Sequence, residues 1–241
     1  MTTRSHGVAT SNRASIDALD RGPSSDGASA AGNRPFVDTW SVADGSRKYT
    51  ITLTEGATCL AASKRFLLTG QVDGLVRLWD AEAGVDLNWT LSTGARTDKT
   101  KLTSITSISF PPADDKRALV ISSDNKVRLL MEAEKGFKVL GDRPLDMRIQ
   151  PNLPPNLVWA GAFTRDGEGL VTCGDRDAQI WSINAGKPRF VRRFAPHRQL
   201  TAAAFAKRQV VVGQLVNENL AVTAGERTAK LWDTDTNKAI A

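Results

Sequence analysis

The chain has 241 residues, and its 32 basic and 26 acidic side chains give a formal net charge of +6. Its apolar runs are short, such as Phe66-Leu67-Leu68, which excludes the roughly 18 or more apolar residues of a membrane-spanning helix. No apolar stretch follows the basic residues of segment 1–13, so we expect a flexible tail there, no secretory signal and a cytoplasmic location.

The charge and the cysteines both have an ordinary structural interpretation. Basic residues alternate with acidic ones along the chain, which indicates a mixed solvated surface more than a surface dedicated to polyanions. Cys59 and Cys173 lie far apart among apolar or small residues, with no second cysteine or histidine nearby. This setting predicts two buried free thiols and neither a disulfide nor a metal site.

An internal repeat is the strongest signal in the sequence. Four segments carry alternating apolar and polar residues and end at an aromatic or apolar anchor, and a weaker copy precedes them. The anchors are separated by 39, 51, 51 and 51 positions, and they are Trp40, Trp79, Leu130, Trp181 and Trp232. This regularity indicates repeated copies of one structural unit.

Each repeat reads as four short strands. The anchor strand alternates with period two, and an acid stands six positions before each of the last four anchors, at Asp73, Asp124, Asp175 and Glu226. Small and polar residues beside the acid predict a tight hairpin turn. Further strands are expected at 57–62, 105–110, 158–163 and 200–205, at 66–70, 118–123, 169–174 and 220–225, and after the anchors at 48–53, 87–91, 137–140 and 189–194. Four antiparallel strands form a propeller blade.

The sequence therefore predicts an all-β propeller of about four to five blades over residues 14–241. We place a degenerate first blade at 14–53 and later blades at about 57–91, 104–141, 156–195 and 199–241. The first blade would open with strands at 14–19 and 28–32, although a disordered tail ending near Arg34 is the alternative. The last unit has no room for a full fourth strand after Asn237. We expect an open or incomplete ring, whose missing blades come from a longer chain or another subunit.

The Leu-Trp-Asp segments at 78–80 and 231–233, the turn acid and the repeat spacing resemble the WD-repeat family. The resemblance covers residues 35–241 well and 14–34 loosely. It implies a β-propeller that acts as a protein-interaction scaffold, with other proteins or peptides as partners and without catalysis or a cofactor. A fold shared by many functions does not name the partner.

The resemblance also implies a hydrogen-bonded set of histidine, Ser or Thr, acid and anchor tryptophan in each blade. The last unit carries all four members, as His197, Thr223, Glu226 and Trp232. Two units lack the histidine, with Thr69, Asp73 and Trp79 in one and Thr172, Asp175 and Trp181 in the other. The unit between them keeps Ser122 and Asp124 but has Leu130 at the anchor. These residues are expected to stabilise the blades, with the tryptophan rings buried between neighbouring blades.

The residues for catalysis are scarce. His6 and His197 are the only histidines, and neither stands at ligand spacing from a cysteine or from the other histidine. The glycine-containing segment 70–74 lacks the Lys-Ser/Thr of a phosphate-binding loop. We therefore expect no enzyme, no metal and no cofactor.

Contact residues are expected in the loops and at Trp159. Two linkers, 92–103 and 141–156, are long enough to be functional, although plain mobile loops are the alternative. The interaction candidates are Trp159, Arg96, Lys99, Lys101, Arg143, Arg148 and Arg198. Trp159 lies outside the anchor positions and could instead pack on the linker before it. Nucleic acid or another polyanion is the alternative partner, through Arg96, Lys99, Lys101, Arg192, Arg193, Arg198, Lys207 and Arg208.

Overall fold

The computed structural model describes residues 35–41, 44–93, 103–112, 114–140, 158–164, 166–174, 178–184, 187–194, 200–212, 214–225, 228–233 and 238–240. Every regular element in these ranges is a strand. The strands are β1 (Phe36–Trp40), β2 (Arg47–Thr52), β3 (Ala57–Ala62), β4 (Phe66–Gln71), β5 (Leu75–Asp80), β6 (Asp86–Ser92), β7 (Ile105–Ser109), β8 (Arg117–Ser122), β9 (Val127–Ala133), β10 (Gly136–Val139), β11 (Val158–Phe163), β12 (Gly169–Gly174), β13 (Ala178–Asn184), β14 (Lys187–Phe194), β15 (Leu200–Val212), β16 (Gln214–Gly225), β17 (Thr228–Asp233) and β18 (Lys238–Ala239).

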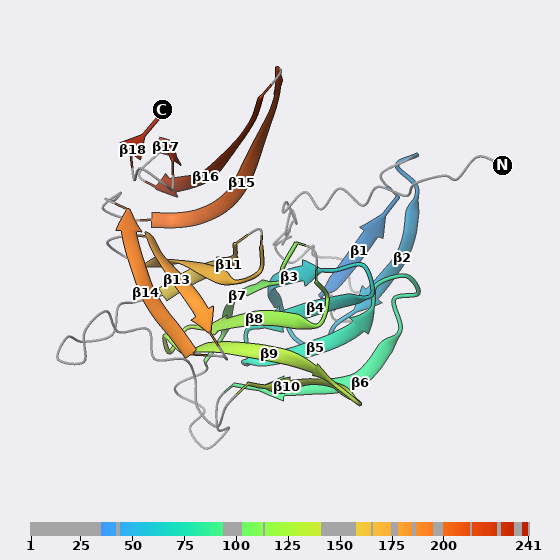
Figure 1. The fold of residues 1–241 in the computed structure, drawn as a ribbon. Coiled ribbons are helices and arrows are strands. Elements are labelled where there is room, and N and C mark those ends of the chain that lie inside the picture. Colours follow the sequence, from blue (N-terminus) through green and yellow to red (C-terminus); the bar gives the residue numbers. More distant parts are fainter. Residues whose placement is uncertain are drawn as a thin grey trace, which may run out of the picture.

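The strands form five antiparallel sheets in chain order. Sheet A contains only β1 and β2, whereas sheets B (β3–β6), C (β7–β10), D (β11–β14) and E (β15–β18) each have four strands in sequential order. Each four-stranded sheet is thus a meander whose first strand is at one edge and whose fourth strand is at the other. Figure 1 shows the sheets following one another from blue to red along the chain.

Turn geometry sets the register of the hairpins between the second and third strands. Gly74 in the β4–β5 turn and Asn125 in the β8–β9 turn both have positive φ, at 80° and 61°. Gly74 donates its N–H to Gln71 O at 3.2 Å, and Asn125 donates to Ser122 O at 2.9 Å. Glycine and asparagine tolerate this left-handed backbone better than other residues, so the turn chemistry matches the conformation.

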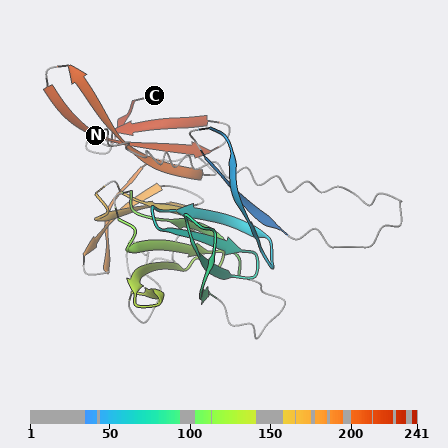
Figure 2. The ribbon, with the colours of Figure 1, turned by 90° about the vertical axis from the view of Figure 1, so that its right-hand side faces the viewer.

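Successive sheets pack face to face through apolar clusters. Sheets A and B share the cluster containing Ile51 and Trp79, and sheets C and D share the cluster containing Leu129 and Trp181. The first strands lie next to one another, because β7 contacts both β3 and β11, and β11 contacts β15. This is the arrangement of propeller blades around an inner row of strands, and the turned view in Figure 2 shows the layers of sheets.

The predicted all-β fold with four-stranded blades is confirmed. Three strands, β3, β11 and β12, have the predicted bounds, and β15 and β16 extend beyond theirs as a longer hairpin. The last unit has a fourth strand of only two residues, β18, which pairs with β17 through Trp232 and Ala239 and through Asp233 and Lys238, so the prediction that it has no room for a full fourth strand is confirmed. The expected strands at 14–19 and 28–32 lie outside the described residues. Among the described strands, none joins sheet A to sheet E in a common sheet.

Candidate functional site

Two anchor tryptophans are hydrogen-bonded to threonines of the neighbouring strand. Trp79 Nε1 donates to Thr69 Oγ1 at 3.0 Å, and Trp181 Nε1 donates to Thr172 Oγ1 at 3.0 Å. All four side chains are buried. Each bond gives the indole N–H an acceptor inside the protein, which avoids the cost of an unpaired buried donor.

The other members of these sets are described in part. The Asp73 carboxylate accepts the N–H of Leu75 at 3.1 Å and so fastens the β4–β5 turn. Trp232 is buried against sheet D, beside Val171 and Cys173. Asp175, His197 and Glu226 and the side chain of Thr223 lie outside what the structure describes.

In sheet C, strand register corrects one assignment. Thr69 is paired with Arg77, two positions before its anchor, and the corresponding pair in sheet C is Val120 with Arg128. Val120 therefore occupies the threonine position, and the prediction that Ser122 does so is wrong. Ser122 lies two residues further along β8, where its hydroxyl has a different set of partners.

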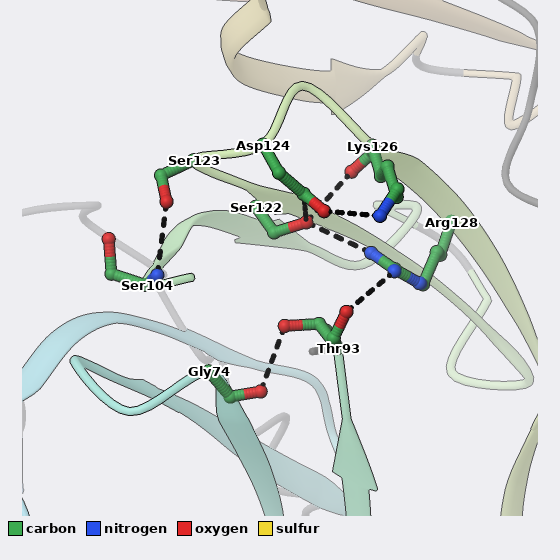
Figure 3. Close-up of polar contacts among 8 residues, drawn as sticks. All are labelled: Gly74, Thr93, Ser104, Ser122, Ser123, Asp124, Lys126 and Arg128. Atoms are coloured by element: carbon green, nitrogen blue, oxygen red, sulfur yellow. Dashed lines mark hydrogen bonds and ion pairs between the residues drawn. The ribbon is translucent and has the colours of Figure 1, made fainter. Parts of the chain in front are cut away.

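Those partners form a polar cluster between sheets B and C (Figure 3). Ser122 Oγ donates to Asp124 Oδ1 at 2.6 Å and accepts from Arg128 Nη1 at 2.9 Å. Arg128 Nη2 donates to the carbonyl oxygen of Thr93 at 3.0 Å, at the end of sheet B. Asp124 is also paired with Lys126 Nζ at 2.6 Å. The buried guanidinium of Arg128 thus links sheet B to sheet C. Sheet C is the sheet in which Val120 and Leu130 take the positions of the hydrogen-bonded threonine and tryptophan.

Aromatic packing fills the space beside Leu130. Phe137 lies edge-on to Phe66 and Trp89, with ring centroids 5.4 and 5.9 Å apart. Trp89 Nε1 donates to Phe137 O at 2.8 Å and connects β6 to β10. All these residues belong to the cluster that contains Leu130. Sheet C therefore keeps a packed interface with sheet B without an anchor tryptophan.

The polar cluster predicts a loss of stability in acid. Burial alone would raise the pKa of Asp124, but hydrogen bonds from Lys126 and Ser122 and the charges of Lys126 and Arg128 outweigh it and lower the pKa below 3.8. A lowered folded-state pKa stabilises the protein above the unfolded pKa, and this stabilisation is lost as pH falls through the folded pKa. The free energy of unfolding should therefore fall below about pH 4.

Asp124→Asn should make that acid dependence shallower, because the variant has no carboxylate to protonate at this position. The measurement is the urea midpoint as a function of pH. Glu134→Gln, on the exposed turn between β9 and β10, removes the same charge outside the cluster and serves as the control. Identical pH profiles for both variants would contradict the assignment.

Trp159 breaks a pattern shared by the first strands of the sheets. The first strand of each four-stranded sheet has a bulge at its second residue, which is Thr58, Thr106, Trp159 or Thr201. Thr58 Oγ1 donates to Gly70 O at 3.1 Å, and Thr106 Oγ1 donates to Ile121 O at 3.3 Å. An indole ring cannot replace a hydroxyl there, and Trp159 is 40% exposed. The sequence marked Trp159 as unusual, but the threonine pattern appears only when the bulges are aligned.

The remaining interaction candidates lie outside the described residues, namely Arg96, Lys99, Lys101, Arg143, Arg148 and Arg198. On β14, Arg193 is exposed and Arg192 is partly buried. No group of three potential metal ligands occurs within the described ranges. Cys59 and Cys173 form no disulfide, and burial raises the pKa of the Cys59 thiol to about 12, so this thiol stays protonated.

Comparison with known families agrees with the architecture. Residues 47–80, from β2 to the end of β5, match the WD domain, G-beta repeat family. No curated protein matches the chain. In the described part of the chain there is no helix that could cross a membrane. Residues 47–80 thus match a WD repeat, and the run of four-stranded antiparallel sheets with buried anchor tryptophans is consistent with WD-type blades.

Proposed function

We propose that this chain is a protein-interaction scaffold without catalysis of its own, and that Trp159 contacts the partner. The observation that carries the proposal is the exposed indole at a bulge where the first strands of the other sheets have threonine. The match to the WD domain supports a role in protein interaction in general, and Trp159 is the specific feature of this chain.

The surroundings of Trp159 suit a contact residue. Val158 on one side is 2% exposed, and Phe163 at the other end of β11 is 3% exposed, so the strand that carries the indole is fixed to the core. A large ring held on a rigid strand loses little conformational entropy on binding. Tryptophans in such positions often dominate the energy of an interface.

The experiment replaces Trp159 with threonine, the residue found at the other bulges. We expect capture of partner proteins from cell extract to fall at least tenfold, which is the scale of a residue worth about 2 kcal/mol in an interface. Stability should change by less than about 1 kcal/mol, because threonine side chains are accommodated at the equivalent bulges of β3 and β7.

Leu87→Thr is the matched control, because Leu87 is also about 40% exposed, at 41%, but lies on β6 of sheet B. Captured proteins are quantified by mass spectrometry and stability by thermal melting. Equal capture by the parent chain, Trp159→Thr and Leu87→Thr would overturn the contact role of Trp159.

Polyanion binding is the second candidate function. The exposed Arg189 and Arg193 on β14 are the described observation in its favour. Affinity that depends on phosphate contacts falls steeply with salt, so binding of single-stranded DNA measured from about 50 to 200 mM salt separates the candidates. Strong, salt-sensitive binding would favour this second function over the scaffold.

A further inference from the structure

The hairpin of β15 and β16 is longer than sheet E requires. The third strand of the sheet, β17, pairs only with Leu220–Gly225 of β16. Beyond that stretch, β15 and β16 continue to pair with each other over 207–212 and 214–219, and we call these two stretches the arm. No other described strand pairs with the arm. Figures 1 and 2 both show it extending away from sheets B, C and D.

The arm has a polar base and an apolar tip. Three polar pairs form the base, namely Lys207 with Asn219, Arg208 with Glu218 and Gln209 with Asn217. Three pairs form the tip, namely Val210 with Val216, Val211 with Leu215 and Val212 with Gln214. Gln214 is the one polar residue of the tip. Both strands therefore change from polar to apolar at the same pair, and the boundary runs straight across the arm.

Apolar residues occupy both faces of the tip. Successive residues of a strand alternate between the two faces, so Val210 and Val212 share one face and Val211 lies on the other. A strand that packs on one side only reads as an alternation, whereas an apolar run is typical of a strand with apolar surroundings on both sides. Two strands alone are marginally stable in water. The tip therefore suits an apolar environment that it enters end-on.

The length of the tip matches the outer part of a lipid bilayer. Three residue pairs span roughly 10 Å along a strand. Interfacial segments bury their apolar part about 5–10 Å deep, at the boundary between headgroups and acyl chains. This depth stops short of the hydrocarbon centre, where the unpaired backbone groups of an open strand edge would be costly. The chain has no apolar run long enough for a spanning helix, and a hairpin tip needs none.

The base of the arm has the charge that an anionic lipid surface attracts. Lys207 and Arg208 outnumber Glu218, and the whole chain has a formal net charge of +6. Basic residues next to anionic headgroups strengthen binding. A second copy of the arm is a poorer match. Two tips paired antiparallel would overlap only over Val210–Val212 before the polar base of each copy is reached.

We propose that the arm inserts its tip end-on into a lipid surface that contains anionic lipids. Val210–Val212 and Val216 enter the boundary between headgroups and acyl chains, and Lys207 and Arg208 lie at the headgroups. This contact is separate from Trp159 and goes beyond the scaffold function, because it would hold the scaffold at a membrane.

The test is flotation of the full chain with vesicles of phosphatidylcholine, with and without phosphatidylserine. We expect the chain to float with the anionic vesicles. Val211→Thr combined with Leu215→Thr makes one tip pair polar and keeps a residue type that favours strands. Binding should fall about tenfold or more, because apolar burial at the boundary is lost. Val191→Thr, at a position on β14 that is 46% exposed, is the matched control and should float like the parent chain.

The contribution of charge is measured with a second pair of variants. Lys207→Gln combined with Arg208→Gln should weaken binding to the anionic vesicles about tenfold or more. Arg189→Gln combined with Arg193→Gln removes the same charge from exposed positions on β14 and should weaken binding less.

A fluorophore sensitive to its environment, attached through Gln214→Cys, reports the insertion itself. The parent chain, treated in the same way, gives the baseline for Cys59 and Cys173. Emission should shift to shorter wavelengths when anionic vesicles are added. This readout does not depend on the threonine variants, whose folding is checked by thermal melting.

Three results would overturn the proposal. The first is a parent chain that does not float, or a fluorophore that does not respond. The second is salt-sensitive flotation that is equal for the parent and the tip variant, which would assign the binding to a polyanion site elsewhere. The third is self-association that the tip variant loses, without flotation, which would assign the tip to a second copy. Trp159→Thr should float like the parent chain, so the scaffold proposal and this one fail separately.

Discussion

Replacing Trp181 by alanine is expected to lower the free energy of unfolding by about 3–5 kcal/mol, the range for deleting a large buried aromatic side chain. The ring is 1% exposed and packs between sheets C and D, beside Leu119 and Leu129. It also lies edge-on to Phe190, with centroids 5.6 Å apart, and donates to Thr172. The substitution removes apolar burial, an aromatic contact and the partner of a buried hydroxyl at once.

Two further variants separate these contributions. Trp181→Phe keeps a ring but loses the donor, so a smaller loss of about 1–3 kcal/mol is expected. Trp40→Ala removes the same residue type from an exposed anchor and should cost less than about 1 kcal/mol. The measurement is urea denaturation with the midpoint and slope fitted together. Comparable losses for Trp181→Ala and Trp40→Ala would mean that the two anchors are not distinguished by blade packing.

Replacing Gly74 by alanine is expected to cost about 2–5 kcal/mol, the sum of backbone strain and overpacking. Gly74 has φ of 80°, where a residue with a Cβ is strained. An added Cβ would lie 2.2 Å from the carbonyl oxygen of Thr103, at the start of sheet C. Because that neighbour is backbone, it cannot move aside without disturbing the junction between sheets B and C.

Gly45→Ala provides the matched control for Gly74→Ala. Gly45 has φ of 70°, but an added Cβ would meet no atom within 4 Å. This variant therefore measures backbone strain alone, about 1–2 kcal/mol. Both variants are measured by thermal melting, and the difference between their losses of stability gives the cost of the clash with Thr103. If Gly45→Ala is as destabilising as Gly74→Ala, close approach of Thr103 does not constrain the turn.

Local sequence patterns were sufficient to predict the blades. The strands around Trp79 and Trp181 alternate with period two and are bounded by turns, and both signals are contained within about 20 residues of chain. The anchors therefore located the third strands, and the neighbouring strands followed from turn positions. The extension of β15 and β16 was missed, because the strands were expected to end at residue 205 and to begin at residue 220.

The strand register and the buried residues of sheet C could not be predicted from local sequence patterns. A hydroxyl near the turn suggested Ser122 as the threonine equivalent, but register depends on how the hairpin closes, and Val120 occupies that position. Arg128 stands where the other third strands also carry polar residues, and the period of two along these strands does not predict its burial. Its burial depends on the carbonyl of Thr93, which comes from another sheet.

For the contact candidates too, the sequence predicted one part and the structure was needed for the other. Trp159 stood out in the sequence because it lies outside the anchor positions. The reason it is unusual is a bulge that four first strands share, and a bulge is a property of strand pairing. The exposure of Trp40 was not foreseen either, because an anchor is buried only when its own blade and the preceding blade are both present.

The most direct test of the blade arrangement is hydrogen exchange of the six tryptophan indoles, resolved by ¹⁵N NMR and assigned by single Trp→Phe variants. The indoles of Trp79 and Trp181, which donate to buried threonines, should exchange slowest, and the buried Trp232 should also be protected. The exposed indoles of Trp40 and Trp159 should exchange fastest in the chain alone. Exchange at Trp79 or Trp181 as fast as at Trp159 would contradict the arrangement of blades described for this protein.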